Sequence, residues 1–157
     1  MGKRQAEACS LAYEAITNVT ARMVAGIAGT YAGIFTVKGT PCAASRPRVT
    51  ANGTFYPASY AKWKRSARKQ LLECSARFPT VPLDEILLAV VHIGVRSPKS
   101  PSKSIPRGDV DNYLKAIFDA LQDVGIIHND SCIAVALASK FYTPDDQEFI
   151  SAALYRL

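Results

Sequence analysis

The sequence predicts an α/β (α+β) fold, in which a small sheet of about four strands is flanked by helices and preceded by an extra N-terminal helix. Three observations predict it. The chain has 157 residues, of which 48% are hydrophobic and 20% charged, so one domain with a substantial core is expected. Segments with the alternating or continuous apolar pattern of strands are separated from segments with helical spacing. Glycines and prolines mark the boundaries between these segments.

The first segment, from Ala6 to about Val24, has the spacing of an amphipathic helix that ends near Gly26. Its apolar residues are Leu11, Ala12, Ala15, Ile16, Val19, Met23 and Val24. We expect this helix to pack against the rest of the chain. Pairing with a second copy and action as a detachable appendage are the alternatives.

The next segments predict a strand, a loop and a basic helix. The strand is expected at residues 34–38, and the prolines of residues 45–50 predict a loop that carries Arg46 and Arg48. The helix begins near Pro57 or Ser59 and runs to about residue 77. Five cations are expected on its exposed face: Lys62, Lys64, Arg65, Arg68 and Lys69. Such a face is either a solvated surface or a contact for the DNA backbone.

The second half of the chain predicts three more strands. Residues 86–95 are almost continuously apolar, which is typical of a central strand, and His92 within it is expected to be satisfied inside the sheet. A mobile basic loop over residues 96–107 follows, with Lys99, Lys103 and Arg107. Strands are then expected at 133–142 and 148–155, joined as a hairpin by a turn at 143–146.

Between these strands lies the most informative segment, an acidic helix that starts near Val110. Asp109 is its expected N-cap, where the side chain can accept from free backbone N–H groups, and Asp111 lies in its first turn. The apolar stripe of the helix is Val110, Tyr113, Leu114, Ile117, Phe118 and Leu121. The opposite face carries Asp111, Lys115 and Asp119 at four-residue steps. Lys115 is therefore expected beside Asp111.

Asp109, Asp111 and Asp130 form a candidate metal site. Two carboxylates about 4 Å apart repel each other by roughly 4 kcal/mol at an intermediate dielectric, so a cation is needed to offset the repulsion. Mg²⁺ suits this role, because it takes carboxylate ligands together with substrate phosphate oxygens, and Lys115 could hold a phosphate oxygen beside it. The alternative is an ordinary solvated helix face with surface ion pairs.

Composition narrows the class of partner. A net charge of +6 indicates a polyanionic partner, most commonly nucleic acid. The four cysteines are widely spaced and there are two histidines, so a zinc site is not expected and the thiols are expected to be free. We find neither a secretory signal nor an apolar run of membrane-spanning length, so a cytoplasmic protein without membrane contact is expected.

From about Gly33 onward the chain resembles the RusA family of four-way (Holliday) junction resolvases of phages and prophages. The resemblance is carried by motifs in a fixed order: Gly39-Thr40-Pro41, Arg46-Pro47-Arg48, Tyr56-Pro57 to Tyr60, Gly108-Asp109-Val110-Asp111-Asn112 with Lys115, Asp119-Ala120-Leu121, and Asn129-Asp130-Ser131 followed by Ile133 and Lys140. It divides the chain into an N-terminal extension, residues 1–32, and an endonuclease domain, residues 33–157. The family usually has Asp where this chain has Asn129, and Gln where it has Cys132.

The resemblance implies a homodimeric, Mg²⁺-dependent endonuclease with a mixed sheet, acting on branched DNA in recombination and repair, with Mn²⁺ as a substitute ion. It implies that Asp109, Asp111 and Asp130 hold the metal and that Lys115 is catalytic. The DNA-binding candidates are Arg46, Arg48, Lys62, Lys64, Arg65, Arg68, Lys69, Lys99, Lys103 and Arg107. Two alternatives stay open: a catalytically silent branched-DNA-binding protein, and an Asp-x-Asp glycosyltransferase, which the short basic chain disfavours.

Overall fold

The computed structural model describes residues 29–50, 53–76, 82–98, 105–143 and 147–157, together with the isolated positions 14, 18, 25 and 26. The predicted N-terminal helix lies almost entirely outside the described residues. Lys99, Lys103 and residues 144–146 of the turn predicted at 143–146 also lie outside them. No helix in the described part is long and apolar enough to cross a membrane.

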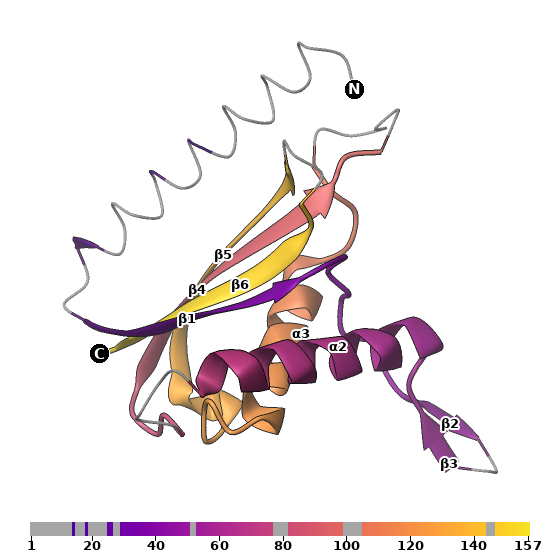
Figure 1. Cartoon of the computed structure of the whole chain (residues 1–157), viewed down its shortest axis with the longest axis horizontal. Coiled ribbons are helices and arrows are strands. Elements are labelled where there is room, and N and C mark those ends of the chain that lie inside the picture. Colours follow the sequence, from indigo (N-terminus) through magenta and orange to yellow (C-terminus); the bar gives the residue numbers. More distant parts are fainter. Residues whose placement is uncertain are drawn as a thin grey trace.

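The described chain forms a mixed four-stranded sheet with two long helices on one of its faces (Figure 1). The strands of this sheet are β1 (Thr30–Lys38), β4 (Leu87–Arg96), β5 (Ile133–Thr143) and β6 (Phe149–Arg156). The helices are α2 (Ala58–Ser75) and α3 (Val110–Asp123), and the 3₁₀-helix η1 (Asp130–Cys132) precedes β5. Two short strands, β2 (Arg48–Thr50) and β3 (Gly53–Phe55), form a separate sheet. The predicted α+β class is confirmed.

The strand order is β1-β6-β4-β5, with β4 parallel to β5 and antiparallel to β6. The prediction of 86–95 as a central strand is therefore confirmed, and His92 is satisfied by a 2.6 Å hydrogen bond to Ser139 on β5. The prediction of a β5–β6 hairpin is wrong. β6 lies on the far side of β4 from β5, because it pairs with β1 and β4.

Residues 48–55 form a hairpin, where a loop was expected. β2 pairs with β3 in antiparallel register, Arg48 opposite Phe55 and Val49 opposite Thr54. Pro47 stands immediately before the first paired residue, so its missing N–H leaves this ladder intact. Thr50 is paired with Gly53, and Gly53 has a φ of +119°, which glycine adopts without strain.

The core lies between the sheet and the two helices. It contains Phe35 and Val37 from β1, Leu87 to Ile93 in alternation from β4, and Ile150, Ala152 and Leu154 from β6. Helix α2 contributes Tyr60, Trp63, Ala67 and Leu71, and α3 contributes Tyr113, Ala116, Ile117, Ala120 and Leu121. Burial of these faces, at roughly 25 cal/mol per Å² of apolar surface, fixes the direction in which α3 presents its polar face.

The two edges of the sheet differ. At the β1 edge, the Gln70 side chain of α2 accepts a hydrogen bond from the Lys38 N–H at 2.9 Å and donates one to the Lys38 carbonyl at 3.0 Å, so it mimics a neighbouring strand. The Cys74 thiol adds a contact to the Ile34 carbonyl at 3.8 Å. The β5 edge has no strand beside it in the described part of the chain.

Candidate functional site

Asp109 and Asp111 lie at the start of α3, as predicted. Asp109 is the N-cap residue with extended backbone angles, φ −86° and ψ 139°, and Asp111 is the acid of the first turn. Both side chains are exposed. The expected capping hydrogen bond from the Asp109 side chain is absent. The two carboxylates therefore face solvent at the positive end of the helix dipole, where a ligand can reach them.

Three contacts fix the backbone at this end of α3. The Lys140 ammonium, from β5, donates to the Gly108 carbonyl. The Ala44 N–H donates to the Asn112 carbonyl at 2.8 Å, which ties residues 41–47 to the first turn. The Tyr113 hydroxyl lies 3.5 Å from the Arg107 carbonyl, and burial raises the pKa of this tyrosine, with smaller contributions from Cys42 and Glu148, so it stays a protonated donor.

Gly108 is required at its position for two reasons. Its φ of +88° lies in the left-handed region that glycine adopts without strain. A Cβ on this residue would also lie 3.0 Å from the Tyr113 ring. The glycine thus allows the chain to turn closely over Tyr113 and to present Asp109 at the helix start.

Lys115 is exposed and lies on the same face of α3 as Asp111 and Asp119. Its ammonium is 3.3 Å from the Asp119 carboxylate, so in this structure it turns away from Asp111 and toward the following turn. The side chain is 62% exposed, and such surface pairs contribute at most about 1 kcal/mol. A phosphate group near Asp111 could therefore recruit Lys115 at little cost.

Asp130 lies at the opposite end of α3. It opens η1, and its backbone N–H donates to the Gln122 side chain at 3.0 Å in the last turn of α3. The side chain of Asn129 caps η1 by accepting from the Ser131 N–H at 2.9 Å. Asn129 therefore has a structural role that leaves the exposed Asp130 carboxylate free. An aspartate at position 129 could accept the same hydrogen bond.

The three aspartates are not brought together within one protomer. Gln122 is eleven positions beyond Asp111 on α3, which corresponds to roughly 16 Å along the helix axis. In the described part of the chain, no group of three His, Cys, Asp or Glu side chains is close enough to hold a metal ion. The hypothesis of a cation cage built from one chain is therefore wrong. The rigid length of α3 is the physical reason.

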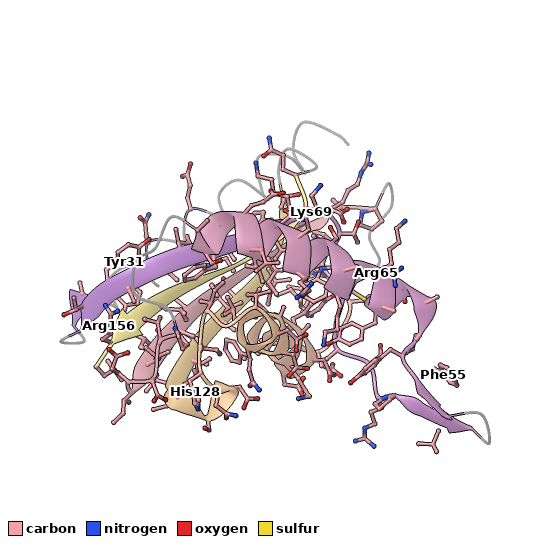
Figure 2. The ribbon with its side chains drawn as sticks, turned by 60° about the horizontal axis from the view of Figure 1, so that its bottom comes forward. Tyr31, Phe55, Arg65, Lys69, His128 and Arg156 are labelled. Atoms are coloured by element: carbon pink, nitrogen blue, oxygen red, sulfur yellow. The ribbon has the colours of Figure 1, made fainter. Side chains whose placement is uncertain are left out.

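Most of the predicted basic surface is exposed. Lys62, Arg65, Arg68 and Lys69 are exposed on α2, and Figure 2 shows Arg65 and Lys69 on its outer side. Lys64 differs from the prediction, because it is partly buried in a 2.7 Å ion pair with Asp123 and lies over the Tyr56 ring. Arg46 and Arg107 are exposed near the start of α3. The side chain of Arg48 is outside the described part of the structure.

Sequence reasoning named Lys140 and Asn129 only as parts of the family motif and missed the contacts that they make. Nothing local to Lys140 indicates its contact with Gly108, because the two residues are 32 positions apart. The role of Asn129 was accessible, since Asn two residues before a serine N–H is a common turn and cap arrangement.

Two comparisons with known proteins bear on this site. The family model described as Endodeoxyribonuclease RusA matches residues 38–148, which is more than half of the chain. The matched range contains the acidic start of α3, Asp130, the β2–β3 hairpin and the basic helix α2. A search of the curated proteins found no match.

Proposed function

The chain belongs to the RusA endodeoxyribonuclease family, and we propose that it is a Mg²⁺-dependent endonuclease that resolves four-way DNA junctions by paired nicks, in the cytoplasm and as a homodimer. Residues 33–157 are the nuclease domain in this proposal and residues 1–32 an extension. The observation that carries it is the pair of exposed carboxylates, Asp109 and Asp111, at the start of α3 within the matched range, for which the described residues supply no ion-pair partner.

The residues at this helix start fit Mg²⁺. Asp109, Asp111 and Asp130 offer oxygen ligands, and none of these carboxylates has an ion-pair partner among the described residues. Hard cations of this kind use one or two carboxylates together with waters and phosphate oxygens, and Mn²⁺ satisfies the same ligands. When bound, the ion would supply an acidified water and charge compensation for the phosphate.

The open edge of β5 supports a dimer. Its exposed residues are small or apolar: Ala134, Val135, Ala136 and Ala138. A long apolar edge strand is a template for pairing with another chain, and proteins normally block such edges with charges, prolines or a covering element. Here α2 blocks the β1 edge through Gln70, whereas Lys140 is the first charge along β5. A second copy of the chain is the partner that this edge suits.

Dimerisation through β5 would also complete the acidic site. β5 runs antiparallel to α3, because it starts beside η1 at the end of α3 and its Lys140 reaches Gly108 at the start of α3. In a two-fold pair of β5 strands, the start of one strand lies beside the end of the other. Asp130 of one protomer would then lie at the same end as the partner subunit's Asp109 and Asp111.

The other charged residues act on the DNA backbone in this proposal. Lys115 turns from Asp119 to a phosphate oxygen and stabilises the charge that develops on it. Arg46, Arg107 and the exposed cations of α2 hold neighbouring phosphates, which positions the substrate without reading its sequence. Two such sites related by a two-fold axis match the symmetry of a four-way junction and allow opposed strands to be nicked.

The test uses Asp109→Asn and Asp130→Asn on a synthetic four-way junction with Mg²⁺. Each variant alone should lose cleavage and keep junction binding, whereas Glu73→Gln, an exposed acid on α2, should cleave normally. Unchanged cleavage by Asp109→Asn would remove this residue from the mechanism.

Mixing the two inactive variants separates a composite site from a single-chain one. In a mixed dimer with composite sites, one site carries both substitutions and the other carries none, so nicking of one strand should return. If each site came from a single chain, every site in the mixture would carry one substitution and no nicking would appear. Subunit exchange before the assay is required and is checked with differently tagged chains.

One alternative keeps an observation in its favour. The separation of Asp130 from Asp109 and Asp111 in the protomer suits a protein that binds branched DNA without cutting it. Such a protein would show salt-sensitive junction binding and no nicking with Mg²⁺ or Mn²⁺. The glycosyltransferase alternative loses its support, because the family match is to endodeoxyribonucleases.

A further inference from the structure

The β2–β3 hairpin projects from the body of the molecule beyond the start of α2 (Figure 1). Figure 2 shows Phe55 apart from the sheet and its two covering helices. Three large hydrophobic side chains are exposed on the hairpin and at its base: Val49 is 80% exposed, Phe55 54% and Tyr56 47%. Projecting apolar side chains carry a solvation cost without a packing gain, so they mark an interaction site.

The two faces of the hairpin both carry such a side chain. Phe55 pairs with Arg48 and shares its face with Gly53, whose added Cβ would lie 3.6 Å from the Phe55 ring. Val49 pairs with Thr54 and therefore lies on the opposite face. A patch that docks on one partner would be apolar on one face only. A hairpin with an apolar group on each face is suited to act as a wedge between two surfaces.

The base of the hairpin is attached to the acidic end of α3. The Ala44 N–H donates to the Asn112 carbonyl, one residue beyond Asp111. Val49 is five positions beyond Ala44, so even a fully extended chain places Val49 within about 18 Å of this tie. A DNA strand held at Asp109 and Asp111 would thus have its neighbouring bases within reach of the hairpin.

The surroundings of the hairpin are cationic. Arg46 is exposed at its base, and Lys62 and Arg65 are exposed in the first turns of α2. Lys64 lies 5.8 Å from the centre of the Tyr56 ring. DNA matches this pattern, because its bases form an apolar stack with phosphates on both sides. The bases would contact the exposed aromatic and aliphatic groups, and the phosphates would contact the cations. A purely apolar partner would offer no counter-charge to the exposed Arg46, Lys62 and Arg65.

We propose that the β2–β3 hairpin is a wedge that inserts Val49 and Phe55 against unstacked bases at the branch point of the DNA; this inference rests on the function proposed above. Bases at a branch lack one stacking neighbour, so the wedge enters there at low cost. An intact duplex must first be unstacked to admit it. The hairpin therefore favours branched DNA over duplex DNA of the same sequence.

The experiment compares the wild-type chain with the double variant Val49→Ala/Phe55→Ala. A matched control, Leu72→Ala/Ile86→Ala, removes two side chains that are exposed elsewhere, 43% and 61%. Affinities for a four-way junction and for a duplex of the same sequence are measured in EDTA. The junction carries 2-aminopurine next to the branch, whose fluorescence rises on unstacking. Thermal melts confirm that all variants fold.

The hairpin variant should bind the junction on the order of ten-fold more weakly, as expected for loss of base stacking, and should bind the duplex as the wild type does. Its 2-aminopurine signal should stay low. The control pair should match the wild type in every measurement. Phe55→Trp, which keeps a stacking ring, should retain junction preference.

The results that would overturn the proposed role of the hairpin differ from those that would overturn the proposed nuclease function. Equal loss of affinity for junction and duplex would reduce the hairpin to a general backbone contact and overturn the wedge. So would wild-type junction binding and fluorescence in Val49→Ala/Phe55→Ala. A wild-type chain that cuts no junction in Mg²⁺ yet shows the hairpin-dependent fluorescence would overturn the nuclease alone. A wild-type chain that binds neither DNA would overturn both.

Discussion

Asn129 provides the clearest test of how the structure holds its neighbour Asp130, a candidate metal ligand, in position. Its side-chain oxygen accepts from the Ser131 N–H at 2.9 Å and so caps η1, next to Asp130. Asn129→Ala removes this acceptor. Asn129→Asp keeps an acceptor at the same place and restores the residue usual in the family. The pair of variants separates loss of the cap from change of charge.

The magnitude follows from the single hydrogen bond that is lost. Removal of an N-cap side chain costs about 1 kcal/mol, which is about a five-fold change in the ratio of ordered to frayed η1. For a chain of 157 residues this corresponds to a fall in Tm of about 2–4 °C if the whole fold feels it. Cleavage should also fall, by at most this five-fold factor, because Asp130 is held in place only while η1 is ordered and activity follows the ordered fraction.

The assays are thermal unfolding and junction cleavage over a Mg²⁺ titration. We expect Asn129→Ala to melt slightly earlier and to cut more slowly, and Asn129→Asp to melt and cut at least as well as the wild type. The reasoning is refuted if Asn129→Ala equals the wild type in both assays, or if Asn129→Asp is as impaired as Asn129→Ala. The second result would mean that the charge at position 129, and not the hydrogen bond that caps η1, determines stability and cleavage.

Three further predictions concern other described contacts. Lys140→Met removes the donor to the Gly108 carbonyl; we expect slower junction cleavage with junction affinity unchanged, and unchanged cleavage would contradict the positioning role. Burial lowers the pKa of His92 from its usual 6.5, so its stability contribution is present above about pH 6.5 and is lost as the pH falls through the lowered value; the fall in Tm between pH 7.5 and 5 should be smaller in His92→Gln. Gly94→Ala would place a Cβ 2.6 Å from Thr143 and 2.7 Å from Phe149, so denaturant unfolding should show a loss of about 1–3 kcal/mol.

Several parts of the fold were predictable because they depend on local periodicity. The start of α3 at Val110, with Asp109 as N-cap, follows from acids placed just before an apolar stripe. The continuous apolar run of β4 predicted a strand covered on both sides by neighbours, and β4 lies between β6 and β5. In both cases the residues that decide the structure are adjacent in the sequence.

The family assignment was also within reach of the sequence. It depends on the order and spacing of short motifs, and the family model matches residues 38–148, which contain them almost entirely. The identity of the acids follows in the same way. Their roles as metal ligands stay a prediction, because ligation depends on distances between side chains that a motif does not give.

Only the tertiary structure decided where β6 lies, that residues 48–55 pair as a hairpin, and that Asp130 is far from Asp109. Periodicity shows which side of a segment is buried. It does not show which distant segment covers that side, so the strand order is known only from the packing of the folded chain. A helix is a rigid spacer of about 1.5 Å per residue, and α3 therefore holds the two acidic ends apart. The sequence by itself determined the acids and the helix that carries them; the fold decided that one chain leaves them separated.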